Sequence, residues 1–187
     1  MNNKIHDLRT FIDEKLPDLL LVQETKCKNI SNPYLPGYLF YRQDGPQAAP
    51  SGGTEIFIKN SLSHVELFIP NIDYISNTIV KVTLSNQPPR IIASVYVPCE
   101  TNRNFLNDLN KSLNLNNSVI MCGDFNAHHT NWNCKKKTVA GNALVHFAQC
   151  NNFEILAPPT PTRFGPSSAT TIDLALIKIF SFNYEID

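Results

Sequence analysis

Three carboxylates, an amide and a phenol stand where apolar segments of this sequence begin or end. They are Glu24, Tyr96, Asp124, Asn126 and Asp173. A buried strand that delivers polar side chains at its end is a common way to build an active site, because the strand is rigid and the loop is open. These residues come from four separate segments, so we expect them to converge at one edge of a sheet sandwich. Each also has an ordinary reading, as a solvated loop residue, a packing tyrosine or a hydrogen-bonding strand end.

Such a set of oxygen atoms suits a hard cation and a phosphate ester. Carboxylate and amide oxygens favour Mg²⁺ or Mn²⁺ over Zn²⁺. The cation would neutralise charge that develops on the phosphate and on the leaving oxygen. In this interpretation Asn126 and Tyr96 orient the phosphate.

The segment from Ser118 to Ala127 carries the densest signal. An apolar run leads into Gly123, and Asp124 and Asn126 follow two residues apart. Residues i and i+2 of an extended chain point to the same side, which would let both side chains reach one site. The alternative is a plain turn, since Gly-Asp and Asn are ordinary turn residues.

Composition predicts one folded domain with no global charge. The chain has 187 residues, 42% of them hydrophobic, and equal numbers of basic and acidic side chains. Any contact with nucleic acid must therefore come from a local patch. Lys135, Lys136 and Lys137 form one candidate patch, although such a run is usually a solvated loop. The five cysteines include no C-x-x-C pair, which favours reduced thiols inside a cell, and no apolar run is long enough for a membrane span.

Hydrophobic periodicity places the elements that must position these residues. Helical spacing predicts helices at 5–16, 104–115 and 140–151. Strands are expected at 18–23, 37–43, 54–59, 65–68, 78–84, 90–97, 118–122, 153–156 and 171–178, with loops at 25–36, 44–53 and 157–168. The run at 18–23 is unbroken, which is typical of a strand covered on both faces. The order predicts an α/β fold of packed mixed sheets with helices outside.

Four segments, in this order, resemble successive motifs of the endonuclease/exonuclease/phosphatase superfamily. They are Leu-Val-Gln-Glu-Thr-Lys at 21–26, Val-Tyr-Val-Pro at 95–98, Gly-Asp-Phe-Asn-Ala at 123–127 and Ile-Asp-Leu-Ala-Leu at 172–176. Gly52-Gly53 before a strand fits the same pattern. His129-Thr130-x-Trp132 and the ending Leu-Ala-Leu-Ile-Lys at 174–178 are similar to endonuclease domains of Jockey-type non-LTR retrotransposons.

The resemblance implies a four-layer α/β sandwich that nicks DNA by metal-assisted hydrolysis and leaves a 3′-hydroxyl for reverse transcription. It implies that Glu24 binds Mg²⁺ or Mn²⁺, that Tyr96 contacts the scissile phosphate and that Asp124 positions or deprotonates the attacking water. It assigns Asn126 to the phosphate and metal environment, and Asp173 to the carboxylate that orients a catalytic histidine. The implied partners are DNA and the reverse transcriptase part of the same element, and the implied location is the nucleus.

The sequence departs from the family pattern at both ends. The family begins with a strand that ends in an asparagine beside the metal, and it finishes with Ser-Asp-His on a last strand. Neither motif occurs in residues 1–187, so we expect a partial domain that lacks the first and last strands. Loss of the histidine would lower the rate by about 10²–10⁴-fold. Unpaired strand edges would favour instability or association.

Two other functions stay open. One is a catalytically inactive domain that at most binds DNA, and the other is a phosphomonoesterase or phospholipase-like hydrolase of the same fold. A zinc site built from Cys122, His128, His129 and Cys134 is disfavoured, because the spacing matches no usual finger and Cys122 falls inside a strand.

Overall fold

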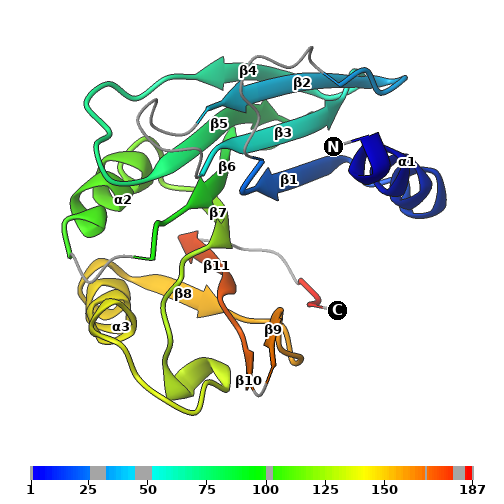
Figure 1. Ribbon diagram of the computed structural model, residues 1–187. Helices are drawn as coiled ribbons and strands as arrows, with labels where there is room; N and C mark the ends of the chain where they lie inside the picture. Colours follow the sequence, from blue (N-terminus) through cyan, green and yellow to red (C-terminus); the bar gives the residue numbers. More distant parts are fainter. Residues whose placement is uncertain are drawn as a thin grey trace.

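A computed structural model describes residues 2–25, 33–44, 52–99, 103–166, 168–178 and 184–186, with side chains from residue 6 onward. Its elements form two packed sheets with helices on both outer sides (Figure 1). This is the α/β class that the sequence predicts. Most of the loops expected at 25–36 and 44–53 fall outside the described residues.

The smaller sheet has the strand order β1–β3–β2 and is antiparallel throughout. Its strands are β1 (Leu19–Gln23), β2 (Tyr38–Gln43) and β3 (Thr54–Lys59). β3 is central and nearly all buried, whereas β1 is an edge strand whose five residues are only half-buried. The prediction that the 18–23 run is covered on both faces was therefore too strong. An edge position explains the exposure, because one side of β1 has no neighbouring strand among the described residues.

The larger sheet has the strand order β4–β5–β6–β7–β11–β8. Its strands are β4 (Ser63–Leu67), β5 (Ser76–Thr83), β6 (Arg90–Tyr96), β7 (Val119–Asp124), β8 (Phe153–Leu156) and β11 (Asp173–Lys178). All neighbours are antiparallel except β6 and β7, which are parallel. The helix α2 (Phe105–Leu113) joins that pair as a crossover.

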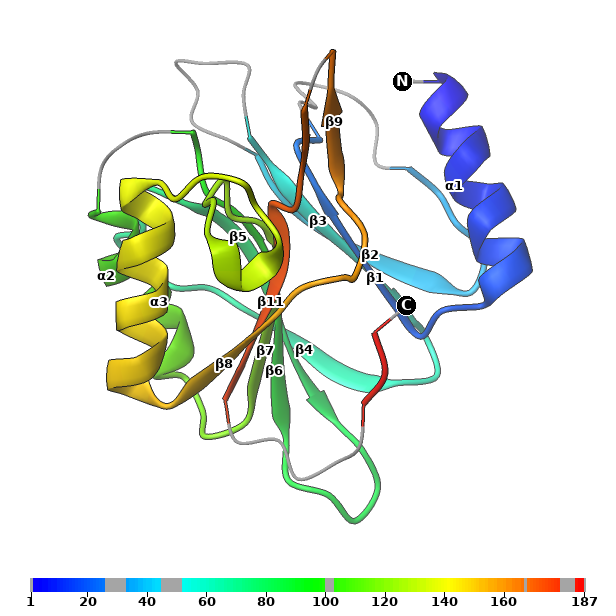
Figure 2. The same cartoon turned by 90° about the horizontal axis from the view of Figure 1, so that it is seen from below.

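The helices complete four layers. α1 (Asn2–Lys15) lies on one side of the sheets, and α2 and α3 (Val139–Asn151) lie on the other (Figure 2). Ile12 of α1 packs in a buried cluster with Phe57 of β3. Leu109 of α2 and Leu144 of α3 join the main core on the far face of the larger sheet. A third cluster, which includes Ile56 and Val80, fills the space between the sheets.

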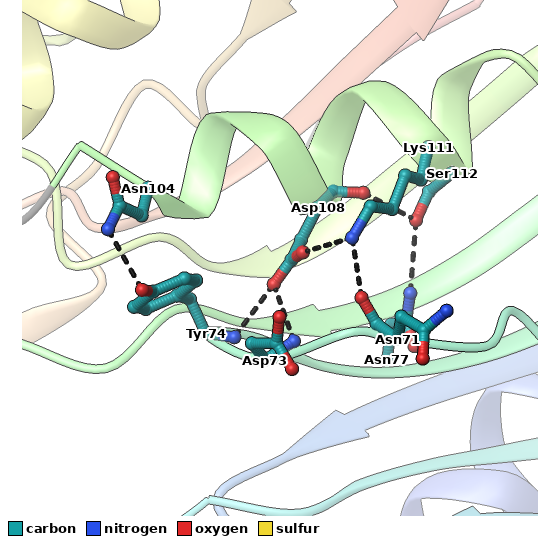
Figure 3. A network of polar contacts seen from close by, with 8 residues as sticks. All are labelled: Asn71, Asp73, Tyr74, Asn77, Asn104, Asp108, Lys111 and Ser112. Carbon is teal, nitrogen blue, oxygen red and sulfur yellow. Dashed lines mark hydrogen bonds and ion pairs between the residues drawn. The ribbon is translucent and has the colours of Figure 1, made fainter.

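A buried carboxylate ties α2 to the segment before β5 (Figure 3). Asp108 is 1% exposed, and its Oδ2 accepts hydrogen bonds from the backbone N–H groups of Asp73 at 3.0 Å and Tyr74 at 2.7 Å. Lys111 Nζ lies 3.2 Å from Asp108 Oδ1. The helix is thereby held against the sheet by polar contacts as well as by its apolar face.

Two features lie where the sequence predicts neither a helix nor a strand. One is a single 3₁₀ turn, η1 (Thr130–Trp132), and the other is a hairpin of β9 (Arg163–Gly165) and β10 (Ser168–Thr170). The hairpin projects beyond the sheets (Figure 2). Strands of three residues are too short to show an alternating pattern. Among the described residues, no helix is long and apolar enough to cross a membrane.

Candidate active site

Three neighbouring strands of the larger sheet end in a row of polar residues. Tyr96 on β6 is paired with Asp124 on β7, and Asp124 is paired with Asp173 on β11. Residues directly opposite on adjacent strands have Cβ atoms about 4.5–5.5 Å apart on one face. The register therefore places a phenol and two carboxylates side by side, at one end of these three strands.

Gly123 makes this row possible. A Cβ atom at this position would lie 1.8 Å from the carbonyl oxygen of Val95 on β6. No side chain fits there, so β6 and β7 approach closely only because residue 123 is glycine. The glycine thus sets the contact between the strands that end in Tyr96 and Asp124.

Glu24 reaches the same edge from the smaller sheet. It directly follows β1 and has a φ of 52°, in the left-handed region that turns the chain sharply. Gln23 Nε2 donates a hydrogen bond of 2.8 Å to Ser94 Oγ on β6, and Ser94 Oγ donates one of 3.0 Å to the carbonyl of Val22. We call this pair of bonds the Gln23–Ser94 clamp. It joins the two sheets one residue before Glu24.

Tyr96 is packed from behind by the Gly52-Gly53 turn. Both glycines have positive φ, near 88°, and a Cβ on Gly52 would lie 3.3 Å from the Tyr96 ring. The carbonyl of Gly53 accepts a long hydrogen bond of 3.5 Å from the N–H of Thr25, next to Glu24. The turn therefore contacts both sides of the site, and a side chain at Gly52 would be crowded by Tyr96 as well as strained by the positive φ.

Asn126 is fixed in a strained backbone conformation with a φ of 45°. Its N–H donates to Asp124 Oδ1 at 2.9 Å, and its Nδ2 donates to the carbonyl of Val97 at 2.9 Å. Its Oδ1 accepts a hydrogen bond of 3.3 Å from Arg163 Nη1. Left-handed backbone at a residue other than glycine persists only where surrounding contacts impose it, and here those contacts include Asp124.

Burial and neighbouring charge raise the proton affinity of two site residues. The pKa of Asp124 is raised to about 6, first by burial and then by the charges of Asp173 and Glu24, while the Asn126 N–H and the charge of Arg163 act in the opposite direction. Burial together with the charge of Glu24 and a hydrogen bond to it raises the pKa of Tyr96 to about 12. Tyr96 is therefore a hydrogen-bond donor at neutral pH, and Asp124 titrates close to neutrality.

A polar cavity of about 290 Å³ opens at this edge. The residues that line it include Gln23, Glu24, Asp124, Thr162, Arg163 and Asp173. Tyr96 and Asn126 contact these residues from behind through the strand pairing and hydrogen bonds described above. The structure thus brings all five strand-end residues to one place, as the sequence suggested, while their chemical roles stay predictions.

The donor set fits a magnesium-type site that is open rather than enclosed. Among the described residues, no three His, Cys, Asp or Glu side chains are grouped so that they could hold a metal ion by themselves. Mg²⁺ is usually held by one or two carboxylates together with water and substrate phosphates. Glu24 and Asp124 supply such carboxylates, and Asp124, whose pKa is raised by burial and then by the charges of Asp173 and Glu24, is a carboxylate that a cation would stabilise in its ionised form. His129 Nδ1 and Cys134 Sγ are engaged elsewhere, with Asn131 and Thr171.

The predicted lysine patch lies away from the cavity. One arginine that the sequence analysis did not single out lies at the cavity instead. Lys135, Lys136 and Lys137 are exposed between η1 and α3, and none of them lines the cavity. Arg163 of β9 does line it. The signal for Arg163 was slight, a lone basic residue in a proline-rich segment, and only the hairpin carries it to Asn126.

Known proteins share both the sequence pattern and the fold. A family described as endonuclease-reverse transcriptase matches residues 90–179. The RNA-directed DNA polymerase from mobile element jockey of Drosophila melanogaster is 30% identical over 158 residues, which are 83% of this chain and 17% of that protein. The probable RNA-directed DNA polymerase from transposon X-element of the same fly is 28% identical over 95% of this chain and 20% of that protein. The chain therefore spans about a fifth or less of the length of these relatives.

Solved structures show the same fold at low identity. The endonuclease domain of TRAS1, a telomere-specific non-LTR retrotransposon, has a TM-score of 0.73 and 17% identity, over 92% of this chain and 77% of that chain. The catalytic domain of Xenopus laevis APE2 has a TM-score of 0.63 and 16% identity, over 91% and 77% of the two chains. Sequence and fold agree, and both make this chain similar to the endonuclease domains of Jockey-type non-LTR retrotransposons, within the endonuclease/exonuclease/phosphatase fold.

Proposed function

We propose that residues 1–187 act as one domain that hydrolyses phosphodiester bonds of DNA with Mg²⁺ or Mn²⁺ and thereby nicks target DNA. The observation that carries this proposal is the meeting of Glu24, from one sheet, with Tyr96, Asp124 and Asp173, from the other, around one polar cavity. A bound divalent cation would supply positive charge to the phosphate and to the leaving oxygen.

In this proposal each of the site residues has a distinct role. Glu24 holds the cation, and Tyr96, which stays protonated, donates a hydrogen bond to the scissile phosphate. Asp124 orients the attacking water and accepts its proton as a general base. Asn126 holds the phosphate beside them. In this proposal DNA is the substrate, the reverse transcriptase part of the same element is the partner, and the nucleus is the place of action.

We expect turnover by this chain to be slow. The family pattern pairs Asp173 with a histidine, and none of the five histidines, all of which are described, lines the cavity. A missing acid/base or electrostatic group costs about 10²–10⁴-fold in rate. An inactive domain that binds DNA is therefore the second candidate, and this observation favours it.

Nicking of supercoiled plasmid tests the proposal. Purified protein with Mg²⁺ or Mn²⁺ should convert supercoiled plasmid to the open circle, and EDTA should stop the conversion. Asp124→Asn should lower the nicking rate about 10²-fold or more, whereas Asp13→Asn makes the same change on the exposed face of α1 and should leave it intact.

Three outcomes separate the candidate functions. Release of phosphate from p-nitrophenyl phosphate without nicking would indicate a phosphomonoesterase instead. Cation-dependent DNA binding without nicking would indicate the inactive binding domain. Nicking that survives Asp124→Asn would contradict the proposed site.

A further inference from the structure

The charges that line the polar cavity do not balance. Glu24, Asp124 and Asp173 are acidic, and Arg163 is the single basic residue among those that line the cavity in the described part of the chain. A phosphodiester adds another negative charge, and a divalent cation offsets only part of the total. A second positive group close to the phosphate would remove much of the remaining repulsion.

We infer that Arg163 is a further catalytic residue of this site, one that binds the scissile phosphodiester through its guanidinium group. The inference rests on the proposed function, because it takes DNA as the substrate. It assigns to the β9–β10 hairpin the positive charge that the strand-end residues lack.

The observed contact of Arg163 is one that a phosphate could replace. Its Nη1 donates to the neutral oxygen Oδ1 of Asn126 at 3.3 Å, which is long for such a bond. Within the described residues Arg163 forms no ion pair with a carboxylate, and its side chain is exposed. Guanidinium groups bind phosphate in a bidentate geometry, and charged hydrogen bonds are about twice as strong as neutral ones. A phosphate beside Asn126 would therefore compete well for this donor.

The backbone next to Arg163 is firmly attached to the start of β11. Thr162 Oγ1 accepts hydrogen bonds from the N–H groups of Ile172 at 3.1 Å and Asp173 at 3.2 Å. The N–H of Thr162 donates to the carbonyl of Thr170 at 3.1 Å. These bonds fix the origin of the Arg163 side chain beside Asp173, while its exposed guanidinium contacts Asn126 through one long hydrogen bond. The backbone at Arg163 is therefore already ordered in the free protein, which lowers the entropy cost of binding DNA.

DNA binding and its salt dependence provide the test. A labelled duplex oligonucleotide would be titrated with protein in Ca²⁺, with fluorescence anisotropy as readout, over a series of salt concentrations. Arg163→Gln should weaken binding about tenfold, the value expected for loss of a charged hydrogen bond. The slope of log K against log salt should fall by about 0.9, the value for one phosphate contact.

Two further variants separate charge from geometry. Arg163→Lys keeps the charge and should restore the salt slope, but a point charge cannot make the bidentate contact, so kcat for nicking should stay below that of the wild type. Arg9→Gln removes the same charge on α1 and should change neither binding nor slope. Thermal unfolding of each variant checks that it is folded.

The outcomes distinguish this inference from the function on which it rests. If the wild-type protein binds DNA and Arg163→Gln binds with the same affinity and slope, the Arg163 inference is wrong and the proposed function stands. If the wild-type protein neither binds nor nicks DNA, both are wrong. A tenfold loss confined to Arg163→Gln, with a reduced slope, supports the inference.

Discussion

At the scale of single residues, the site contains a buried carboxylate and backbone conformations that are each unfavourable for the stability of the fold. Asp124 is only 8% exposed, lies near two other acidic groups and has a raised pKa. Asn126 and Glu24 have left-handed backbone conformations that residues other than glycine rarely adopt. Burial of charge and backbone strain both cost stability, and such costs gather where function requires a fixed geometry.

The raised pKa of the buried Asp124 carboxylate predicts how the free energy of unfolding depends on pH. Its pKa lies above the ordinary value of 3.8 at about 6, so between these values the folded state binds more protons than the unfolded state. The free energy of unfolding should therefore fall as pH rises through this window and stay low above it. Asp124→Asn removes the ionisation and keeps the oxygen that accepts from Asn126. Without divalent cations at neutral pH, the variant should be more stable than the wild type, and Tm should rise by about 2–4 °C for each kcal/mol.

Thermal unfolding in EDTA at several pH values measures this effect. The advantage of the variant should shrink as pH falls below about 6 and vanish near 3.8, where both forms are neutral. A variant less stable than the wild type at neutral pH would show that Asp124 makes a net stabilising contribution as a carboxylate.

At the scale of elements, the sheets are joined near the site by polar contacts. The Gln23–Ser94 clamp connects β1 to β6, and Thr54 Oγ1 lies 2.9 Å from Thr78 Oγ1, connecting β3 to β5. Ser94 is fully buried. Away from the site the same interface is apolar, with Ile56, Ile58 and Val82. The polar end holds Glu24 in place relative to Asp124.

Ser94→Ala is a small substitution, but it should perturb the metal site because it breaks the Gln23–Ser94 clamp. It leaves Gln23 Nε2 without an acceptor from Ser94 and should lower the free energy of unfolding by about 1–3 kcal/mol. It should also weaken Mn²⁺ binding, measured by electron paramagnetic resonance, because Glu24 loses its fixed position. Thr78→Val removes a comparable link on the neighbouring strands, between β3 and β5, that does not involve β1, and it should cost stability without changing Mn²⁺ affinity. Equal Mn²⁺ affinities in both variants would limit the clamp to a structural role.

The contacts of Asp108 give a second prediction at this scale. Asp108→Ala leaves two backbone N–H groups without this acceptor and removes the partner of Lys111 (Figure 3). Urea unfolding should show a loss of about 2–4 kcal/mol. Asn104→Ala removes a hydrogen bond to the Tyr74 hydroxyl at the exposed start of the helix and should cost less than about 1 kcal/mol. Similar losses for the two variants would contradict the role of the buried carboxylate.

The sequence predicts long elements well and short ones poorly. Phe105, Leu109 and Leu113 recur at intervals of four residues, so α2 was readable, and the apolar run into Gly123 marked β7. The β9–β10 hairpin was not, because its strands of three residues gain their pairing from each other and from contacts with β11 rather than from a pattern. Arg163 was missed for the same reason. The contacts of a side chain on an irregular segment cannot be predicted from the spacing of residues in the sequence.

At the scale of the whole molecule, the cavity lies across the boundary between two sheets. Glu24 belongs to the smaller sheet, whereas Asp124 and Asp173 belong to the larger one. A second cavity, of about 260 Å³ and lined mainly by apolar residues that include Leu21, Leu156 and Leu174, lies between the same two sheets. The two sheets are thus incompletely packed against each other beside the site.

A cation bound by Glu24 and Asp124 should therefore cross-link the sheets. Mg²⁺ or Mn²⁺ should raise Tm in proportion to RT ln(1 + [L]/Kd), about 2.7 kcal/mol at one hundred times Kd. Glu24→Gln and Asp124→Asn should each abolish most of this rise, and Asp13→Asn on α1 should leave it unchanged. Ca²⁺ and Mg²⁺ added at equal ionic strength to KCl controls separate site binding from screening. A rise of equal size in all variants would place the cation elsewhere.

The order of strands along the chain also makes the molecule divisible. β1–β3 form the smaller sheet, β4–β8 and β11 form the larger one, and the exposed turn after Lys59 joins the two sheets. A chain cut at that turn would yield two fragments, the first with Glu24 and the second with Tyr96, Asp124, Asp173 and Arg163. Neither piece holds a complete set of reactive groups, so hydrolysis would require their reunion. Under the proposed function, such a pair should behave as a split enzyme, with activity only when the two fragments are brought together.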